Sequence, residues 1–284
     1  MIHVLNEMKE DQLDLKYHNP PAIGGGKNIC WASLRPGKKA INVIGGDACC
    51  DCNSEFSRAI AAAGIGPVRH ISACPSFEEF CLLGDSSYNI LIKADVQPIA
   101  EYIKKTLGIP YCYAPHYYGL DSISQNYCRL EAFLDVKLPT AAYREEAEKS
   151  INFYCRQLGA ISLAVGEAAN AHPFELARAL VAYGFNVPYI FSDEAGEDDQ
   201  EHIAWLAARR PQTRIFLNSQ YGLETFPAQK LKVDLAIGLN GEAFGAGFKT
   251  IQSIARLPYG YEGAVCLLRE MTKVMNNPHL WARL

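Results

Sequence analysis

The chain has 284 residues, of which 49% are hydrophobic, and this supplies enough apolar material for one large domain or two ordinary ones. Its formal net charge of −4 gives no basic surplus, which argues against a nucleic-acid partner. No run approaches the roughly 20 consecutive apolar residues that a membrane helix needs, and the acidic N-terminus does not resemble a signal peptide. We therefore expect a cytoplasmic protein that neither spans a membrane nor binds nucleic acid.

Residues 1–38 contain a Pro-Pro pair and a Gly-Gly-Gly tract, and we expect them to form an arm or the remnant of a preceding domain. From residue 39 onward, strand-like and helix-like runs alternate. Glycines close two of the helical runs, as is usual at helix C-termini. The expected strands cover residues 40–44, 68–72, 88–92 and 109–114, and the expected helices cover 54–63, 96–107 and 120–134.

A Lys-Leu-Pro-Thr linker at 137–140 precedes a polar helix at 143–158 and a second series of alternating runs. Its expected strands cover residues 161–165, 188–191, 214–217 and 233–237, and its expected helices cover 173–183, 199–209 and 263–275. Strands that alternate with helices indicate parallel βαβ units. The sequence thus predicts an α/β fold of two consecutive Rossmann-like parallel-sheet domains, residues 39–138 and 143–284, with helices on both faces.

Ligands of doubly wound sheets bind at the carboxyl ends of the strands, so the loops there are the candidate sites. The first such loop follows the strand at 40–44 and carries Gly45, Gly46, Asp47, Cys49, Cys50 and Cys52. Three thiols near a helix N-terminus favour the thiolate and hence metal ligation or redox chemistry. Adjacent cysteines do not have the spacing of a zinc ribbon, and a small-residue loop with incidental thiols is the alternative interpretation.

Two further loops carry histidines. His116 follows the strand at 109–114 among aromatic residues and could donate or accept a proton or bind a metal, although a lone loop histidine is more often structural. Glu167 and His172 follow the strand at 161–165 and could face a cleft between the units. The alternative is that His172 and Pro173 only open the next helix. The glycine-rich tracts match neither a P-loop nor a dinucleotide-binding fingerprint.

Several features, taken in order, resemble component 1 of nitrogenase and its relatives. They are residues 42–47 (NVIGGD), 107–111 (LGIPY), 117–119 (YYG), 258–263 (PYGYEG) and 275–278 (MNNP). That family includes nitrogenase subunits, a cofactor-assembly scaffold and tetrapyrrole reductases. The resemblance runs from about residue 40 to the end and implies stacked Rossmann-like domains with a metallocofactor or tetrapyrrole cavity between them.

The chain also departs from this family. Members have three such domains, and the first supplies cysteines to an Fe–S cluster. We expect this chain to correspond to the second and third domains, so the resemblance does not imply that cluster here. The cysteine and histidine that hold the nitrogenase cofactor should fall within residues 91–95 and near Ile251, where neither residue type occurs. Dinitrogen reduction is therefore not expected. Lys93 and Asp95 occupy the first of these positions and would suit an anionic ligand such as a carboxylated tetrapyrrole.

The resemblance implies an oxidoreductase subunit that holds an Fe–S cluster, another metallocofactor or a tetrapyrrole between its domains. It would receive electrons from an ATP-dependent iron-protein-type reductase and pair with a second component 1-like chain or with a copy of itself. The expected catalytic residues are His116, Lys93 and Glu167; the expected cofactor-binding residues are Gly45, Gly46, Asp47, Asp95 and His172; and the expected metal ligands are Cys49, Cys50 and Cys52. The alternatives are a non-catalytic carrier or scaffold for a metallocofactor and a binder of small molecules that resembles periplasmic binding proteins.

Overall fold

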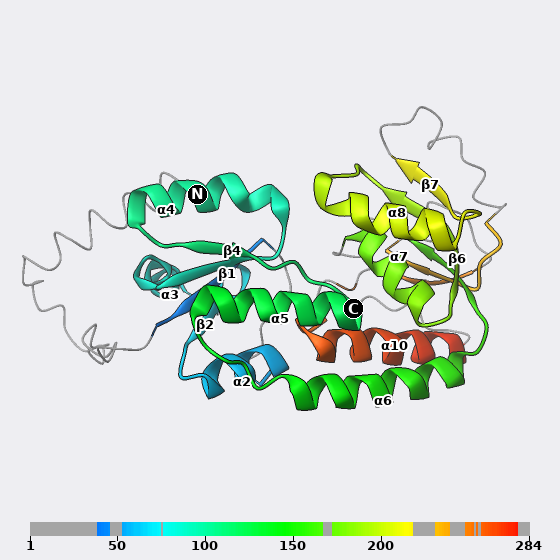
Figure 1. Ribbon diagram of the computed structural model, residues 1–284, viewed down its shortest axis with the longest axis horizontal. Helices are drawn as coiled ribbons and strands as arrows, with labels where there is room; N and C mark the ends of the chain where they lie inside the picture. The colour runs from blue at the N-terminus through cyan, green and yellow to red at the C-terminus, as the bar shows by residue number, and fades with distance from the viewer. Residues whose placement is uncertain are drawn as a thin grey trace, which may run out of the picture.

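The computed structural model describes residues 39–45, 53–74, 76–166, 172–217, 231–238, 248–252, 254 and 257–277. They form two units, each built on a parallel sheet, that lie side by side (Figure 1). The first sheet has the strand order β2-β1-β3-β4, and every neighbouring pair is parallel. Its strands are β1 (Ile41–Ile44), β2 (Val68–His70), β3 (Tyr88–Leu91) and β4 (Tyr111–Tyr113).

Helices cover both faces of the first sheet. One face packs Ile44 and Leu91 against Ile103 of α4, and the other packs Val43 and Ile90 in a cluster with residues of α2 and α5. The ends of these helices follow from sequence, because the Ser54 hydroxyl caps α2 and Gly108 ends α4 in the left-handed conformation. The helices are α2 (Glu55–Ala62), α3 (Phe77–Cys81), α4 (Gln97–Leu107) and α5 (Leu120–Leu134), with short 3-10 turns η2 (Ile71–Ala73), η3 (Leu82–Asp85) and η4 (Ala94–Val96).

The second sheet is also parallel and has the order β7-β6-β5-β8-β9. Its strands are β5 (Ser162–Val165), β6 (Asn186–Ser192), β7 (Arg214–Leu217), β8 (Leu235–Ile237) and β9 (Lys249–Ile251), and its helices are α7 (Pro173–Ala182), α8 (Gln200–Arg209) and α10 (Tyr261–Asn276), with a 3-10 turn η6 (Glu197–Asp199). The sequence did not predict β9, because three residues are too few to show a strand period. The described helices pack on the face that bears Leu163, Ile190 and Ile237.

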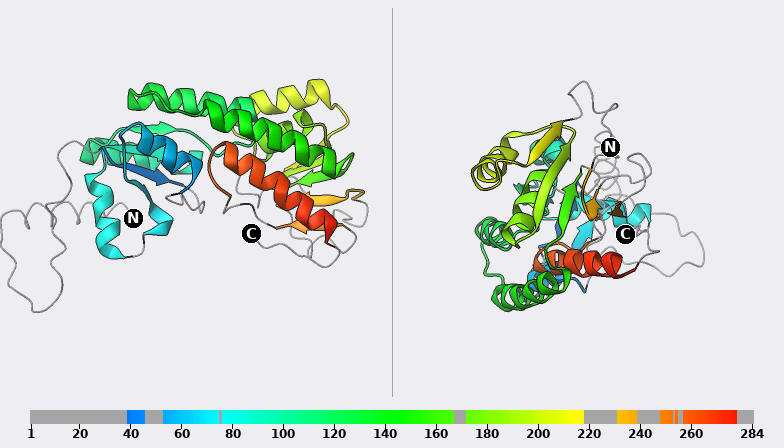
Figure 2. Two further views of the ribbon diagram at one scale, coloured as in Figure 1. Left: turned by 90° about the horizontal axis from the view of Figure 1, so that it is seen from below. Right: turned by 90° about the vertical axis from the view of Figure 1, so that its right-hand side faces the viewer.

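A long helix, α6 (Ala141–Leu158), connects the two units and packs along α10 (Figures 1 and 2). A single apolar cluster runs from Ile41 in β1 through α5, α6 and α10 to Leu163 in β5, so the two units share a continuous core. The predicted α/β class with two parallel sheets is confirmed. None of the described helices is long and apolar enough to cross a bilayer.

Candidate functional site

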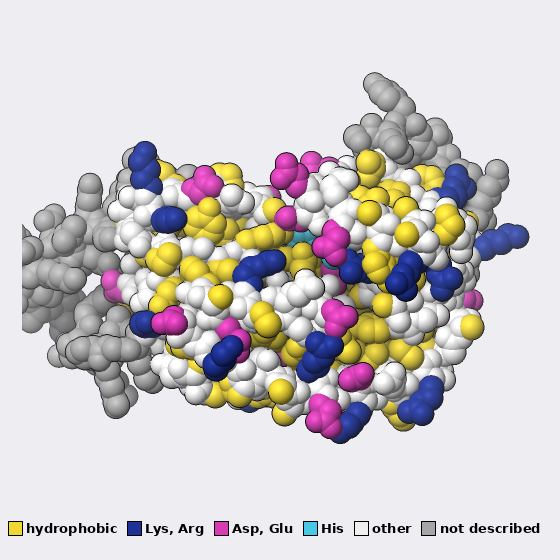
Figure 3. Space-filling view, in the orientation of Figure 1, with side chains coloured by type: hydrophobic (Ala, Val, Ile, Leu, Met, Phe, Trp, Pro, Cys, Tyr) yellow, Lys and Arg dark blue, Asp and Glu magenta, His cyan; other side chains and the backbone are white. Residues whose placement is uncertain are grey.

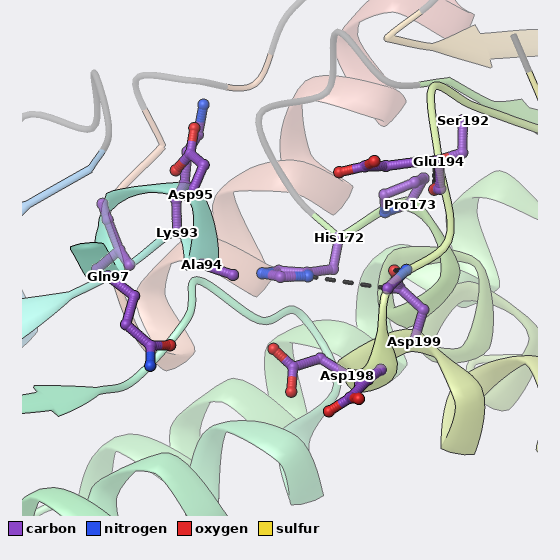
Figure 4. A pocket seen from close by; sticks show the side chains of 13 residues that line it. Lys93, Ala94, Asp95, Gln97, His172, Pro173, Ser192, Glu194, Asp198 and Asp199 are labelled. Carbon is purple, nitrogen blue, oxygen red and sulfur yellow. Dashed lines mark hydrogen bonds and ion pairs between the residues drawn. The ribbon is translucent and has the colours of Figure 1, made fainter. Parts of the chain in front are cut away.

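A cavity of about 440 Å³ lies between the carboxyl ends of strands from both sheets (Figure 4). The first unit contributes the loop after β3, including Lys93 and Asp95. The second unit contributes His172 and Pro173 at the start of α7, together with part of the segment 192–199 that follows β6. Both strand ends are the positions where doubly wound sheets bind ligands, so this inter-unit cavity is the candidate site.

Gly45 brings the end of β1 against the wall of this cavity. Its φ of +105° is a conformation that side chains disfavour, and a Cβ there would lie 2.9 Å from Cγ2 of Val96 and 3.2 Å from the backbone N of Lys93. The close approach is to other residues of the chain, Gly45 does not itself line the described cavity, and its predicted cofactor-binding role stays a prediction. The next residues of that loop, Gly46 and Asp47, lie outside the described residues.

His172 lies at the boundary between the units and contacts both. Its Nε2 is 3.2 Å from the hydroxyl of Tyr113 in β4, and its Nδ1 is 3.9 Å from Oδ1 of Asp199 in η6. The ring of Tyr117 meets the imidazole edge to face at 5.5 Å. In Figure 4 the imidazole lies between Ala94 on one side and Asp199 on the other. Residues of the two units thus hold one imidazole at the cavity wall.

A second cavity of about 460 Å³, the outer cavity, shares Glu197 and Asp198 with the first. Tyr113 lines it, so the hydrogen bond between Tyr113 and His172 connects the walls of the two cavities. On the face shown in Figure 3, acidic and basic side chains border this hollow in the middle of the molecule. His202 also lines the outer cavity, and burial together with the Arg178 guanidinium lowers its pKa.

Carboxylates dominate the described lining of the inter-unit cavity. Against Lys93 and His172, the lining includes five acidic residues: Asp95, Glu194, Glu197, Asp198 and Asp199. A negative potential of this kind disfavours a polyanion and favours a cation or a metal-bearing group. The described lining therefore does not support the expected preference for an anionic ligand.

The structure separates His116 from this cavity. Its side chain is buried and stacks on Tyr118 at 4.9 Å and near Tyr259 at 5.7 Å. Burial lowers its pKa to about 4, which the carbonyl of Pro258 opposes. His116 is not among the described residues that line either cavity, and its predicted catalytic role stays a prediction.

The remaining predicted residues lie outside the part of the chain that the structure describes; they are Glu167, Cys49, Cys50 and Cys52. Within the described ranges, no group of three or more His, Cys, Asp or Glu side chains is placed to hold a metal ion. No sequence pattern identified Asp198, Asp199 and Tyr113, which line the two cavities. The acidic run at 193–199 follows a predicted strand directly, and that position could have identified its carboxylates.

Two buried carboxylates also join the units, at a region that we call the junction. Glu55, the first residue of α2, accepts hydrogen bonds from the backbone N of Tyr261 (3.2 Å) and of Glu262 (2.6 Å) at the start of α10, and from the hydroxyl of Tyr127 (2.7 Å). Glu262 in turn accepts a bond from the backbone N of Glu55 at 2.9 Å. Each helix N-terminus is thus capped from the other unit.

Glu175 of α7 makes the reverse connection. Its two carboxylate oxygens accept hydrogen bonds from the backbone N of Tyr118 and of Gly119, each at 2.9 Å, at the start of α5. Burial raises the pKa of Glu175, and that of Glu55, above the usual range of a glutamate, although the hydrogen bonds oppose this shift. The junction is therefore a pair of reciprocal helix caps across the boundary.

Comparison with known proteins agrees with this architecture. The structure of "Nitrogenase Cp1 at pH 6.5" superposes with a TM-score of 0.62 at 18% identity, over 86% of this chain and 62% of that chain. "Nitrogenase Cp1 at pH 5" gives a TM-score of 0.55 at 15% identity, over 85% of this chain and 58% of that chain. The chain thus spans about three fifths of the length of these structures. A comparison with curated protein sequences gives no match.

At these identities the structural similarity shows the fold alone. The comparison with protein families goes further than the fold. Residues 23–276 match the family "Nitrogenase component 1 type Oxidoreductase". That range includes both sheets, the junction and the described lining of the inter-unit cavity. The chain therefore belongs to the nitrogenase component 1 type oxidoreductases.

Proposed function

We propose that this chain is a nitrogenase component 1-like oxidoreductase subunit that binds a metal-bearing cofactor or an Fe–S cluster in the inter-unit cavity. The observation that supports the proposal most directly is the cavity itself, where the carboxyl ends of strands from both sheets meet around His172. Its volume of about 440 Å³ is within the range of cofactor and small-molecule pockets.

The described residues fit a metal-bearing group better than a metal-free carboxylated tetrapyrrole. His172 presents one ring nitrogen next to Asp199, whose buried Oδ1 accepts no hydrogen bond from any described residue. Histidine nitrogens and carboxylate oxygens are common ligands of transition metals. When bound, such a group would supply redox chemistry, while these side chains would hold and orient it.

Dinitrogen reduction is not part of this proposal. The loop after β3, where the family resemblance implies a cysteine ligand, has Lys93 and Asp95 at the cavity wall. The proposed electron donor is an ATP-dependent iron-protein-type reductase, and the proposed partner is a second component 1-like chain or a copy of this one. A cytoplasmic location belongs to the same proposal.

A metallocofactor carrier or scaffold is the second candidate function. The same cavity supports it, because a carrier and an oxidoreductase subunit would both need cavity residues that hold the cofactor. Turnover separates the two functions. An oxidoreductase subunit, once loaded, is reoxidised by a substrate after reduction through an iron-protein-type ATPase, whereas a carrier only transfers its cofactor to an acceptor protein.

The test is anaerobic purification followed by reconstitution with iron and sulfide, and in parallel an absorbance titration with iron protoporphyrin. We expect stoichiometric binding of at least one of these groups, and we expect Asp199→Asn to weaken it. Lys149→Ala, at an exposed position on α6, is the matched control and should bind as the unaltered chain does. Failure of the chain to bind either group would contradict the proposal.

A further inference from the structure

The neighbours of His172 restrict which of its ring nitrogens carries the proton. Nε2 is within hydrogen-bond distance of the Tyr113 hydroxyl at 3.2 Å, so one of these two groups donates to the other. Nδ1 is 3.9 Å from Oδ1 of Asp199, which is too far for a hydrogen bond. The direction of the bond between Tyr113 and His172 therefore determines the tautomer.

The distance to Asp199 indicates that direction. An Nδ1–H group beside a buried carboxylate oxygen would form a hydrogen bond of about 2.8 Å, whereas Nδ1 and Oδ1 are 3.9 Å apart. Nε2–H of His172 then donates to the Tyr113 oxygen, and Nδ1 keeps a lone pair.

That lone pair faces a second acceptor. The Asp199 side chain is 13% exposed, and its Oδ1 is buried without a hydrogen-bond partner among the described residues. Its other oxygen, Oδ2, is engaged by the backbone N of Gly196 at 2.9 Å, which fixes the carboxylate. Two acceptors at 3.9 Å with no proton between them repel each other, and a cation between them would satisfy both.

The distance is within reach of a single metal ion. Metal–nitrogen and metal–oxygen bonds of first-row ions sum to about 4.2 Å, slightly more than the 3.9 Å between the two acceptor atoms. One ion therefore reaches both at a wide angle, and a small movement of the side chains would narrow that angle. The ion would lie at the wall of the inter-unit cavity, since His172 and Asp199 both line it. The described residues place no third such side chain near these two, so water or the bound group would complete the coordination.

We propose that Nδ1 of His172 and Oδ1 of Asp199 form a two-donor anchor for a divalent metal ion or for the metal centre of a larger cofactor. Tyr113 is a positioning residue that holds the imidazole as its Nε2–H tautomer. This inference rests on the proposed function, in which the cavity binds a metal-bearing group. It adds the identity of the side chains that ligate the metal.

Manganese(II) alone is a suitable probe, because it prefers oxygen and nitrogen ligands and competes poorly for the ten thiols of the chain. Free Mn²⁺ is followed by electron paramagnetic resonance during a titration of the full chain. We expect His172→Gln and Asp199→Asn each to weaken binding at least about tenfold, and Tyr113→Phe to weaken it about tenfold.

Matched controls exist for the histidine and aspartate changes. His202→Gln removes a histidine of the outer cavity, and Asp234→Asn alters a carboxylate that caps the backbone N of Ser162 within the second unit. Both should bind Mn²⁺ within about twofold of the unaltered chain, well short of the losses expected at the anchor. Urea unfolding of every variant shows whether a loss of binding follows from a loss of folding.

A second readout reports the tautomer directly. Long-range ¹H–¹⁵N spectra distinguish a protonated Nε2 from a protonated Nδ1, and we expect Nε2–H in the metal-free chain and a shift toward Nδ1–H in Tyr113→Phe. Protonation of Nδ1 in the unaltered chain, or Mn²⁺ binding that both His172→Gln and Asp199→Asn leave unchanged, would overturn the anchor. Retained binding of iron–sulfide or iron protoporphyrin in that case would leave the proposed function standing.

Discussion

The junction and the inter-unit cavity both join the two units, but they differ in chemistry. At the junction, each buried carboxylate accepts hydrogen bonds from backbone amides of the opposite unit, and the surrounding side chains are aromatic. At the cavity, carboxylates outnumber the groups that could neutralise them, and Oδ1 of Asp199 accepts no hydrogen bond from the described residues. The polar groups of the first region are satisfied by the protein itself, whereas the second region keeps a buried acceptor without a hydrogen bond from the described residues.

Two of the five motifs that carry the family resemblance belong to the first region. Residues 117–119 provide the amides that Glu175 caps, and residues 258–263 provide the amides that Glu55 caps. Three cavity residues, Lys93, His172 and Asp199, lie outside all five motifs. These two motifs therefore concern how the units assemble, and the ligand of the cavity has to be inferred from other residues.

The largest effect on stability is expected at Gly260, between the two helices of the junction. A Cβ there would lie 2.4 Å from the Tyr127 hydroxyl and 2.8 Å from Oε1 of Glu55, at a φ of +90°. Gly260→Ala should lower the free energy of unfolding by about 3 kcal/mol or more, from clash and backbone strain together. Gly108→Ala is the control, since its φ is also positive but nothing lies within 4 Å, and it should cost about 1 kcal/mol. Equal losses in urea unfolding would contradict the packing account.

The pH dependence of stability tests the burial of His116 beneath α10. Its folded pKa of about 4 is below the ordinary 6.5, so the unfolded ring binds a proton at a pH where the folded ring does not. This contribution to stability is complete above pH 6.5 and is lost as the pH falls toward 4, by up to about 3 kcal/mol. His116→Gln should remove that part of the pH dependence in urea unfolding measured between these limits. An unchanged profile would place the imidazole in contact with solvent.

Glu175→Gln should cost about 2 kcal/mol, because an amide oxygen can accept only one of the two backbone N–H groups and its NH₂ group opposes the other. Hydrogen exchange of Tyr118 and Gly119 measures the loss residue by residue. Asp234→Asn is the matched control, since that carboxylate accepts a bond within one unit and is exposed. Exchange at residues 118 and 119 that stays as slow as in the unaltered chain would show that Glu175 does not cap α5.

The smallest effect on stability is expected in the cavity, at Lys93. Its side chain makes no ion pair among the described residues, so Lys93→Ala should change the free energy of unfolding by less than about 0.5 kcal/mol. Removing one positive charge from an acidic lining should tighten Mn²⁺ binding by about twofold to threefold. Weaker Mn²⁺ binding in the titration would contradict the electrostatic description of the cavity.

The sequence predicts much of the fold, because buried strands such as 88–91 and helix ends such as Gly108 carry local signals. It predicts less of the site. Lys93, Asp95 and His172 were identified by their places after strands, but Tyr113 meets His172 only through a contact between the two units, and Asp199 meets it only because η6 lies near the start of α7 within the second unit. The caps of Glu55 and Glu175 also depend on contacts between the units, which no local pattern reveals.

The central claim is that the junction determines the assembly of the units and the cavity determines what they bind. It is tested most directly by measuring urea unfolding and Mn²⁺ binding on the same samples of Gly260→Ala and Asp199→Asn. We predict that Gly260→Ala loses about 3 kcal/mol of stability but binds Mn²⁺ within about twofold of the unaltered chain while folded. We predict that Asp199→Asn keeps its stability within about 1 kcal/mol but binds Mn²⁺ at least about tenfold more weakly. Loss of both properties in either variant would contradict the claim.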